Sequence, residues 1–88
     1  MWALKQEGTI EFLLYLHKKE KVKVSDALRD LDVGQSALYT ALNKLMKAGL
    51  ITETKGERFP FPRFFTLTDK GMEIAKHLVE IKKILENT

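Results

Sequence analysis

A group of polar side chains recurs at helical spacing near the middle of the chain. The positions i, i+3, i+4 and i+7 are taken by Ser36, Tyr39, Thr40 and Asn43. This spacing places them on one side of an α-helix. Such side chains can read base edges from a helix lying in the major groove of DNA, where asparagine can bind adenine through two hydrogen bonds. We expect a DNA-reading face here; an ordinary solvated helix surface is the alternative.

Basic residues accompany this face. Lys44 and Lys47 follow in the same segment, where they could bind phosphate, although Lys47 could equally serve the helix dipole. Further basic residues flank a later loop, and arginine suits a narrow minor groove. Glu53 and Glu57 oppose them, so a charged, solvated hairpin is the alternative there. The candidate DNA-binding residues are Gln35, Ser36, Tyr39, Thr40, Asn43, Lys44 and Lys47 on the helix, and Lys55, Arg58 and Arg63 on the hairpin.

The helix that carries the polar face is predicted over residues 35–48. Its opposite side would bury Leu38, Ala41, Leu42 and Leu45. Gly49 would end it as a left-handed cap. A shorter helix is expected before it, from an N-cap at Ser25 to about Leu31. Because only residues 32–34 separate the two helices, the segment predicts a helix-turn-helix.

The remaining pattern supplies the supporting elements. A first helix is expected from a capping Thr9 to Lys19, and its inward residues would be Ile10, Leu13, Leu14 and His17, widened by Phe12 and Leu16. A short strand over 22–24 and two strands over 50–55 and 64–67 follow, the last two forming a wing. Thr68 would cap a long helix over 69–86. The fold class is therefore α+β, mostly α: a winged helix-turn-helix, as a single domain over residues 1–88.

The loop between the wing strands contains the run Phe59-Pro60-Phe61-Pro62. It could form a rigid aromatic tip that contacts DNA or a partner, or fold back over the hairpin; we expect at least one of its phenylalanines to pack. Phe64 and Phe65 should point to opposite faces of their strand, one into the core and one partly exposed.

Apolar residues of the last helix recur at 4-3-4 spacing: Ile74, Leu78, Ile81 and Leu85. Such a seam is typical of helix pairing. A neighbouring stripe of Met72, Ala75 and Val79 could cover the domain body. We therefore expect a homodimer through this helix, with the two DNA-reading helices about 34 Å apart. The alternative is a helix covered entirely by its own domain.

Residues 24–71 resemble winged helix-turn-helix regulators of the MarR and PadR type. The likeness is carried by residues 25–38, by residues 42–51, similar to the family pattern "L..L...GLI", and by residues 65–71, similar to "LTxKG". It implies a DNA-binding regulator. Thr40 stands where these families commonly have an arginine, and only one helix follows the wing. Full MarR-type proteins have more helices around a ligand cleft, so no small-molecule effector is inferred.

The composition argues against other classes of function. There is no cysteine, and therefore no disulfide or thiolate metal site. His17 and His77 have no spacing relation to each other or to a carboxylate pair, and no phosphate loop or nucleophile motif occurs. We expect no enzyme activity, cofactor or metal. No apolar run reaches the about 20 residues that span a bilayer, and the first residues do not resemble a signal peptide, so we expect a cytoplasmic protein without membrane contact.

Together these observations predict a homodimeric regulator that binds specific double-stranded DNA. The net charge of +3 permits this. A winged-helix protein-protein interaction module and a non-specific architectural DNA-binding protein remain as alternatives.

Overall fold

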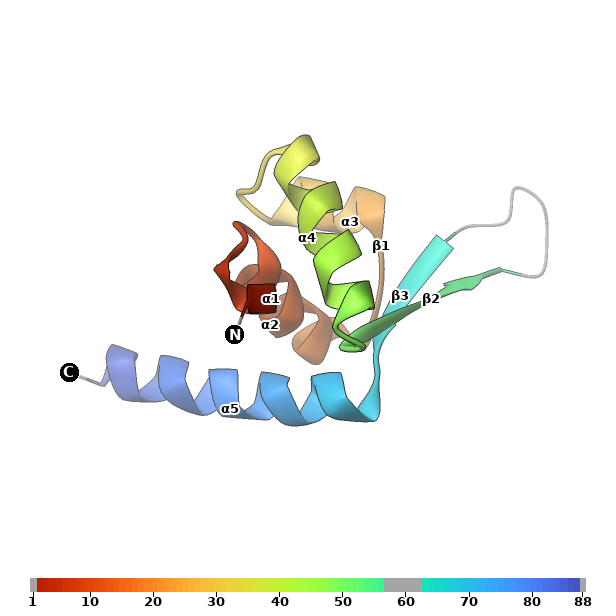
Figure 1. Ribbon diagram of the computed structural model, residues 1–88. Helices are drawn as coiled ribbons and strands as arrows, with labels where there is room; N and C mark the ends of the chain where they lie inside the picture. The colour runs from red at the N-terminus through yellow and green to blue at the C-terminus, as the bar shows by residue number, and fades with distance from the viewer. Residues whose placement is uncertain (1, 57–62, 88) are drawn as a thin grey trace.

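The computed structural model describes residues 2–56 and 63–87. Its elements in chain order are α1 (Trp2–Lys5), α2 (Thr9–Lys19), β1 (Lys21–Lys23), α3 (Val24–Asp30), α4 (Gln35–Lys47), β2 (Ile51–Lys55), β3 (Arg63–Leu67) and α5 (Asp69–Glu86). Figure 1 shows α3 and α4 above the sheet, the hairpin of β2 and β3 projecting to one side, and α5 running beneath α2. The predicted winged helix-turn-helix is confirmed, and the short helix α1 was not predicted.

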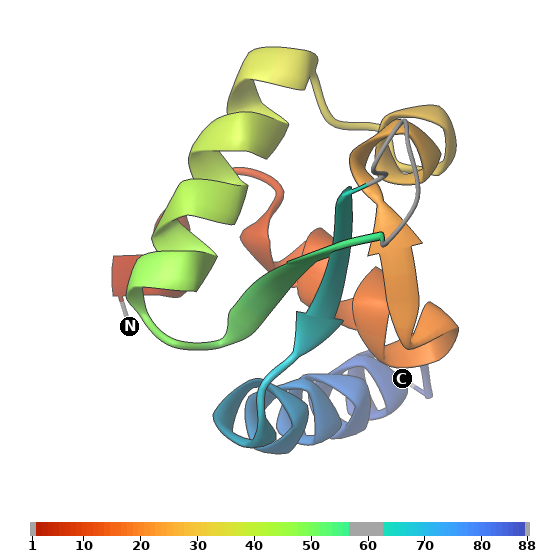
Figure 2. The same ribbon diagram turned by 90° about the vertical axis from the view of Figure 1, so that its right-hand side faces the viewer.

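The three strands form one antiparallel sheet in the order β1-β3-β2 (Figure 2). Val22 and Glu53 both stand opposite Phe65, which lies in the central strand. Side chains alternate across a strand, so Phe65 enters the core while Phe64 lies on the other face. There the Lys21 ammonium sits 4.4 Å from the Phe64 ring centre. The prediction of opposite faces for Phe64 and Phe65 is confirmed.

The core joins α2 and α4 to the sheet. All four residues predicted for the inner side of α4, Leu38, Ala41, Leu42 and Leu45, are buried. From α2, Phe12 packs edge-on against Phe65, with ring centres 6.1 Å apart. Transfer of these apolar side chains out of water is the main force that holds the helices on the sheet.

The face predicted for α2 was partly wrong. Its buried residues are Thr9, Phe12, Leu13 and Leu16. Ile10 is exposed, and Leu14 and His17 are half-buried. Because the helix is apolar around much of its circumference, its periodicity fits two overlapping faces, and the position of the sheet selects one of them.

The starts of α2 and α3 also differ from expectation. Gly8, not Thr9, is the N-cap of α2, and the Thr9 hydroxyl donates to the Gln6 carbonyl at 2.8 Å. The helix α3 begins two residues early, at Val24, so Ser25 lies inside it. Its N-cap is Lys23, whose N–H donates to Asp26 Oδ2 at 3.4 Å. The aspartate at N3 thus accepts from the N–H of the N-cap residue, and Ser25 does not cap the helix.

The end of α4 and the start of α5 meet at one junction. Gly49 has φ 75°, the left-handed conformation that was predicted for the end of α4. The Thr68 hydroxyl donates to the Gly49 carbonyl at 2.6 Å and accepts from the Gly71 N–H at 3.0 Å. The Thr68 N–H donates to the Leu50 carbonyl at 3.1 Å. These bonds fix the direction in which α5 leaves the wing.

Candidate nucleic-acid interface

The helix α4 turns its polar face to solvent. Ser36, Tyr39, Thr40 and Asn43 are all exposed, and 45 % of the Tyr39 surface is accessible. No acidic residue occurs in α4, so this face would not repel phosphate. Gln35 and Lys47 are exposed at its two ends. The face exists because the leucines of α4 are buried on the opposite side.

Two of the expected contact residues already have partners within the protein. Thr40 Oγ1 donates to the Ser36 carbonyl at 3.0 Å, which engages its hydroxyl proton. Lys44 is half-buried, and its ammonium donates to Gln6 Oε1 at 3.2 Å. Lys44 therefore connects the N-terminal segment to α4, a contact that its position in the sequence did not indicate.

A hydrogen bond at the protein surface connects the helix-turn-helix to α2. Tyr15 donates from its hydroxyl to Asp30 Oδ2 at 2.5 Å, and Arg29 donates to the same carboxylate at 2.9 Å. The bond from Arg29, followed by that from Tyr15, lowers the pKa of Asp30 to about 2. The bond to Asp30 raises the pKa of Tyr15 to about 12. Both groups thus keep their hydrogen-bonding forms over the physiological pH range.

The wing is less freely basic than its composition suggests. Lys55 is exposed. Arg63, expected beside the loop, begins β3 and donates to Glu53 on the neighbouring strand, with Nε–Oε1 at 2.5 Å and Nη2–Oε2 at 3.0 Å. The side chain of Arg63 is still 63 % exposed. Arg58 and the run Phe59-Pro60-Phe61-Pro62 lie outside the described residues.

A groove of about 410 Å³ lies between α4 and the wing. Its polar lining comprises Lys23, Ser25, Tyr39, Asn43, Glu53 and Arg63, and Met46 and Phe65 are among its apolar residues. The groove joins the predicted helix residues to the predicted wing residue Arg63. Glu53 was not predicted as part of this site, because from the sequence it indicated only a charge that opposes the basic residues of the wing. Alternation along paired strands, had the register been known, would have placed it beside Arg63.

The helix α5 divides the predicted seam in two. Ile74 and Leu78 pack against the protein's own core. For this half of the helix, the structure agrees with the alternative in which the helix is covered by its own domain. Beyond them the helix extends past the body (Figure 1), and Ile81 and Leu85 are 52 % and 70 % exposed. The two halves therefore have different surroundings.

The two histidines come together in the fold. His17 on α2 and His77 on α5 both line a cavity of about 500 Å³, together with Glu73, Lys76, Val79 and Glu80. In residues 2–56 and 63–87, however, no three His, Asp or Glu side chains are grouped so as to hold a metal ion. No helix in those residues has the length and apolar character needed to cross a membrane.

Comparison with known proteins decides the family. Residues 6–71 match the family model described as "Sugar-specific transcriptional regulator TrmB", which accounts for most of the chain. The chain belongs to this TrmB family. This family is one of transcriptional regulators, which agrees with the expectation of a regulator and not an enzyme.

Two relatives of this TrmB-family chain are identical to it at about a third of the aligned positions. It is 32 % identical over 69 residues to the transcriptional regulator AdcR of Streptococcus pneumoniae, an alignment that covers 78 % of this chain and 47 % of that protein. It is also 32 % identical over 80 residues to the uncharacterized protein MJ0944 of Methanocaldococcus jannaschii, covering 89 % and 66 %. The chain thus spans less than two thirds of either relative.

Solved structures show the same fold. The putative transcriptional regulator ytfH from Salmonella typhimurium matches with a TM-score of 0.81 and 18 % identity, covering 96 % of this chain and 75 % of that one. A transcriptional regulator homologue from Pyrococcus horikoshii matches with a TM-score of 0.72 and 23 % identity, covering 99 % and 97 %. A putative MarR-family regulator from Porphyromonas gingivalis matches with a TM-score of 0.79 and 19 % identity, covering 100 % and 87 %. The resemblance to MarR-type winged-helix regulators is therefore confirmed for the fold.

Proposed function

We propose that this TrmB-family chain regulates transcription in the cytoplasm by binding a specific double-stranded DNA sequence. The helix α4 enters the major groove, and the wing lies on the adjacent backbone or minor groove. The observation that carries this proposal is the exposed, acid-free polar face of α4. An exposed tyrosine and asparagine offer hydrogen bonds that base edges can satisfy.

We assign roles within this face from the exposure and contacts of its residues. Asn43 and Ser36 are exposed and face bases, whereas Lys47 at the end of α4 binds phosphate, which positions the protein without reading sequence. Lys44 contributes charge from its place beside Gln6. On the wing, Lys55 binds the backbone. Its contribution is electrostatic and falls with salt concentration.

We further propose that the chain acts as a homodimer through α5. Ile81 and Ile84 are 52 % and 65 % exposed on the part of α5 that extends past the body. A second copy of the same helix would cover them, and a two-fold dimer would present two α4 helices to one face of DNA about one helical turn apart. In such a dimer Ile74 and Leu78 hold α5 on the core of their own protomer and do not contact the second copy.

The test is selection of bound sequences from a random pool of duplexes at near-physiological salt. A specific regulator should prefer one duplex over random DNA by about 10³ or more. Asn43→Ala should change which sequences are selected. Lys47→Ala should weaken all duplexes alike and reduce the slope of log K against log salt by about 0.9.

Lys82→Ala is the matched control for Lys47→Ala. It removes the same charge from the exposed side of α5, where Lys82 lies 3.8 Å from Glu86, and should leave binding almost unchanged. Enrichment of no sequence, together with a steep salt dependence, would make the protein an architectural DNA binder instead. If neither Asn43→Ala nor Lys47→Ala changes DNA binding, the polar face of α4 does not contact DNA and the assignment is refuted.

A further inference from the structure

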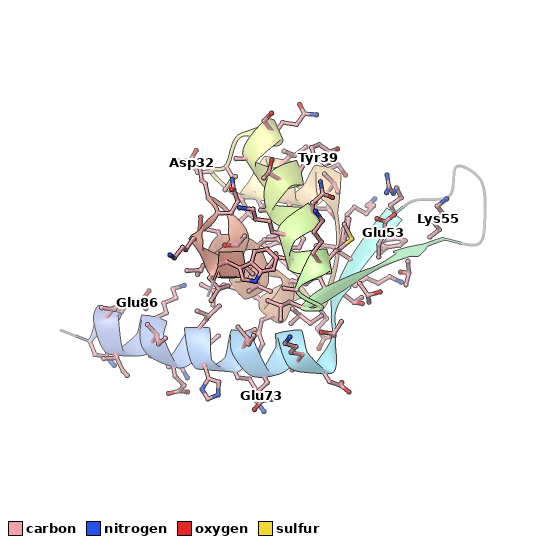
Figure 3. The ribbon with its side chains drawn as sticks, in the orientation of Figure 1. Asp32, Tyr39, Glu53, Lys55, Glu73 and Glu86 are labelled. Carbon is pink, nitrogen blue, oxygen red and sulfur yellow. The ribbon has the colours of Figure 1, made fainter. Side chains whose placement is uncertain are left out.

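The carboxylate of Glu53 occupies an unexpected place at the DNA-facing side of the wing. Only 19 % of its side chain is exposed, and both of its oxygens accept hydrogen bonds from Arg63. Figure 3 shows Glu53 part-way along the hairpin, between Tyr39 of α4 and Lys55 nearer the wing tip. A negative charge at this point opposes the contact that the basic wing residues would make.

The strand register explains why Glu53 lies there. It stands opposite Phe65, and Lys55 stands opposite Arg63, so all four share one face of the hairpin. Phe65, with 3 % of its surface exposed, is the last core residue on that face. Glu53 and Arg63 therefore lie where the core ends and the groove beside α4 begins.

Glu53 keeps its charge at neutral pH. The hydrogen bond from Arg63, and the positive charges of Arg63 and Lys55, lower the pKa of Glu53 despite its partial burial. The sugar-phosphate strand that separates the major groove from the minor groove must pass between α4 and the wing if each enters its own groove. The phosphates of that strand would then approach this carboxylate.

We propose that Glu53 is a specificity-determining residue, which holds the Arg63 guanidinium in one orientation at the edge of the groove and opposes phosphates that enter without matching base contacts. This inference rests on the proposed function. Repulsion lowers the affinity for every duplex alike and by itself leaves the ratio of affinities unchanged. The discrimination comes from Arg63: Glu53 holds its guanidinium in one orientation, so it cannot turn to bind any nearby phosphate. Glu53 thus weakens binding to arbitrary DNA more than binding to the preferred sequence.

The test is Glu53→Gln, which keeps the size of the side chain, removes its charge and replaces one of the two oxygens that accept from Arg63 by an NH2 group that cannot accept. Affinity for a random-sequence duplex should rise about fivefold, the effect of one unit charge about 4 Å from a phosphate in water. Release of Arg63 to a phosphate should steepen the slope of log K against log salt by about 0.9. The ratio of affinities for the selected and random duplexes should fall several-fold.

Glu73→Gln is the matched control, because it makes the same change in net charge on α5, where Figure 3 shows Glu73 on the side away from the wing. It should leave both affinities unchanged. In an Arg63→Gln background, Glu53→Gln should no longer steepen the salt slope. A thermal unfolding curve for each variant verifies that it is folded.

The outcomes separate this inference from the proposed function. An unchanged affinity ratio in Glu53→Gln, or an equal change in Glu73→Gln, would overturn the role of Glu53 alone if Asn43→Ala still alters the selected sequence. If neither the natural protein nor Glu53→Gln binds any duplex, the proposed function fails and this inference fails with it.

Discussion

Substitution of Gly71 by alanine offers a sharp test of how α5 is attached to the wing. Gly71 lies in the first turn of α5, where helix propensity alone predicts that alanine stabilises the helix by about 1 kcal/mol. In the structure, however, an alanine Cβ would lie 1.8 Å from the Leu50 carbonyl oxygen and 2.8 Å from its carbonyl carbon. Both atoms belong to the backbone, so no side chain can move aside.

The cost follows from the displacement. An ordinary contact between carbon and a carbonyl oxygen is about 3.3 Å, so α5 and Leu50 must separate by roughly 1.5 Å. Overpacking of this kind costs about 1–3 kcal/mol. The same movement breaks the bonds from Thr68 to the Leu50 and Gly49 carbonyls, each contributing about 1 kcal/mol. After the gain in propensity, we expect a net destabilisation of about 2–4 kcal/mol, or a fall of ~10–25 °C in Tm.

Two other glycines provide graded controls. Gly34 has ordinary backbone angles with nothing within 4 Å of an added Cβ, so Gly34→Ala should change stability by less than about 1 kcal/mol. Gly49 also has open space but a φ of 75°, so Gly49→Ala should cost about 1–2 kcal/mol from backbone strain alone. Thermal and urea unfolding followed by circular dichroism measure all three. A Gly71→Ala protein as stable as Gly34→Ala would refute the reasoning.

Three further perturbations test other parts of the structure. Leu45→Ala, at a fully buried position, should cost about 2–5 kcal/mol in urea unfolding, whereas Met46→Ala beside it should cost less because Met46 is only half-buried. The pKa of Asp30 is lowered from 3.8 to about 2, so its stabilisation is present above about pH 4 and lost as the pH falls towards 2. The urea concentration at the unfolding midpoint should therefore be higher for the natural protein than for Asp30→Asn at pH 7, and the two midpoints should converge near pH 2. A difference between the midpoints that does not change with pH would contradict this. Ile84→Asp should shift the sedimentation coefficient from dimer to monomer without changing the far-ultraviolet spectrum, because Ile84 is 65 % exposed; an unchanged sedimentation coefficient would exclude α5 pairing at that residue.

Much of the fold could be predicted from the sequence because local chemistry specified it. The apolar period of α4, the left-handed glycine at its end and the capping threonine of α5 each act within a few residues, and the structure has all three where expected. The predictions of the buried face of α2 and of the start of α3 were wrong, because at both places the local pattern is compatible with two structures. The apolar surface of α2 is too broad for its period to select one face, and α3 begins two residues before the position at which Ser25 could cap it.

The sequence by itself determined that α4 has one leucine-rich side and one polar side, because both arise from a single helical period. It also determined the break between α3 and α4 and the resemblance to winged helix-turn-helix regulators, although the TrmB family itself was not predicted. Only the tertiary structure decided that Arg63 is bound by Glu53, that Lys44 meets Gln6, and that α5 packs with its first half and projects with its second. These contacts join residues distant in the chain through strand register and helix packing, which depend on the whole core and not on any local pattern.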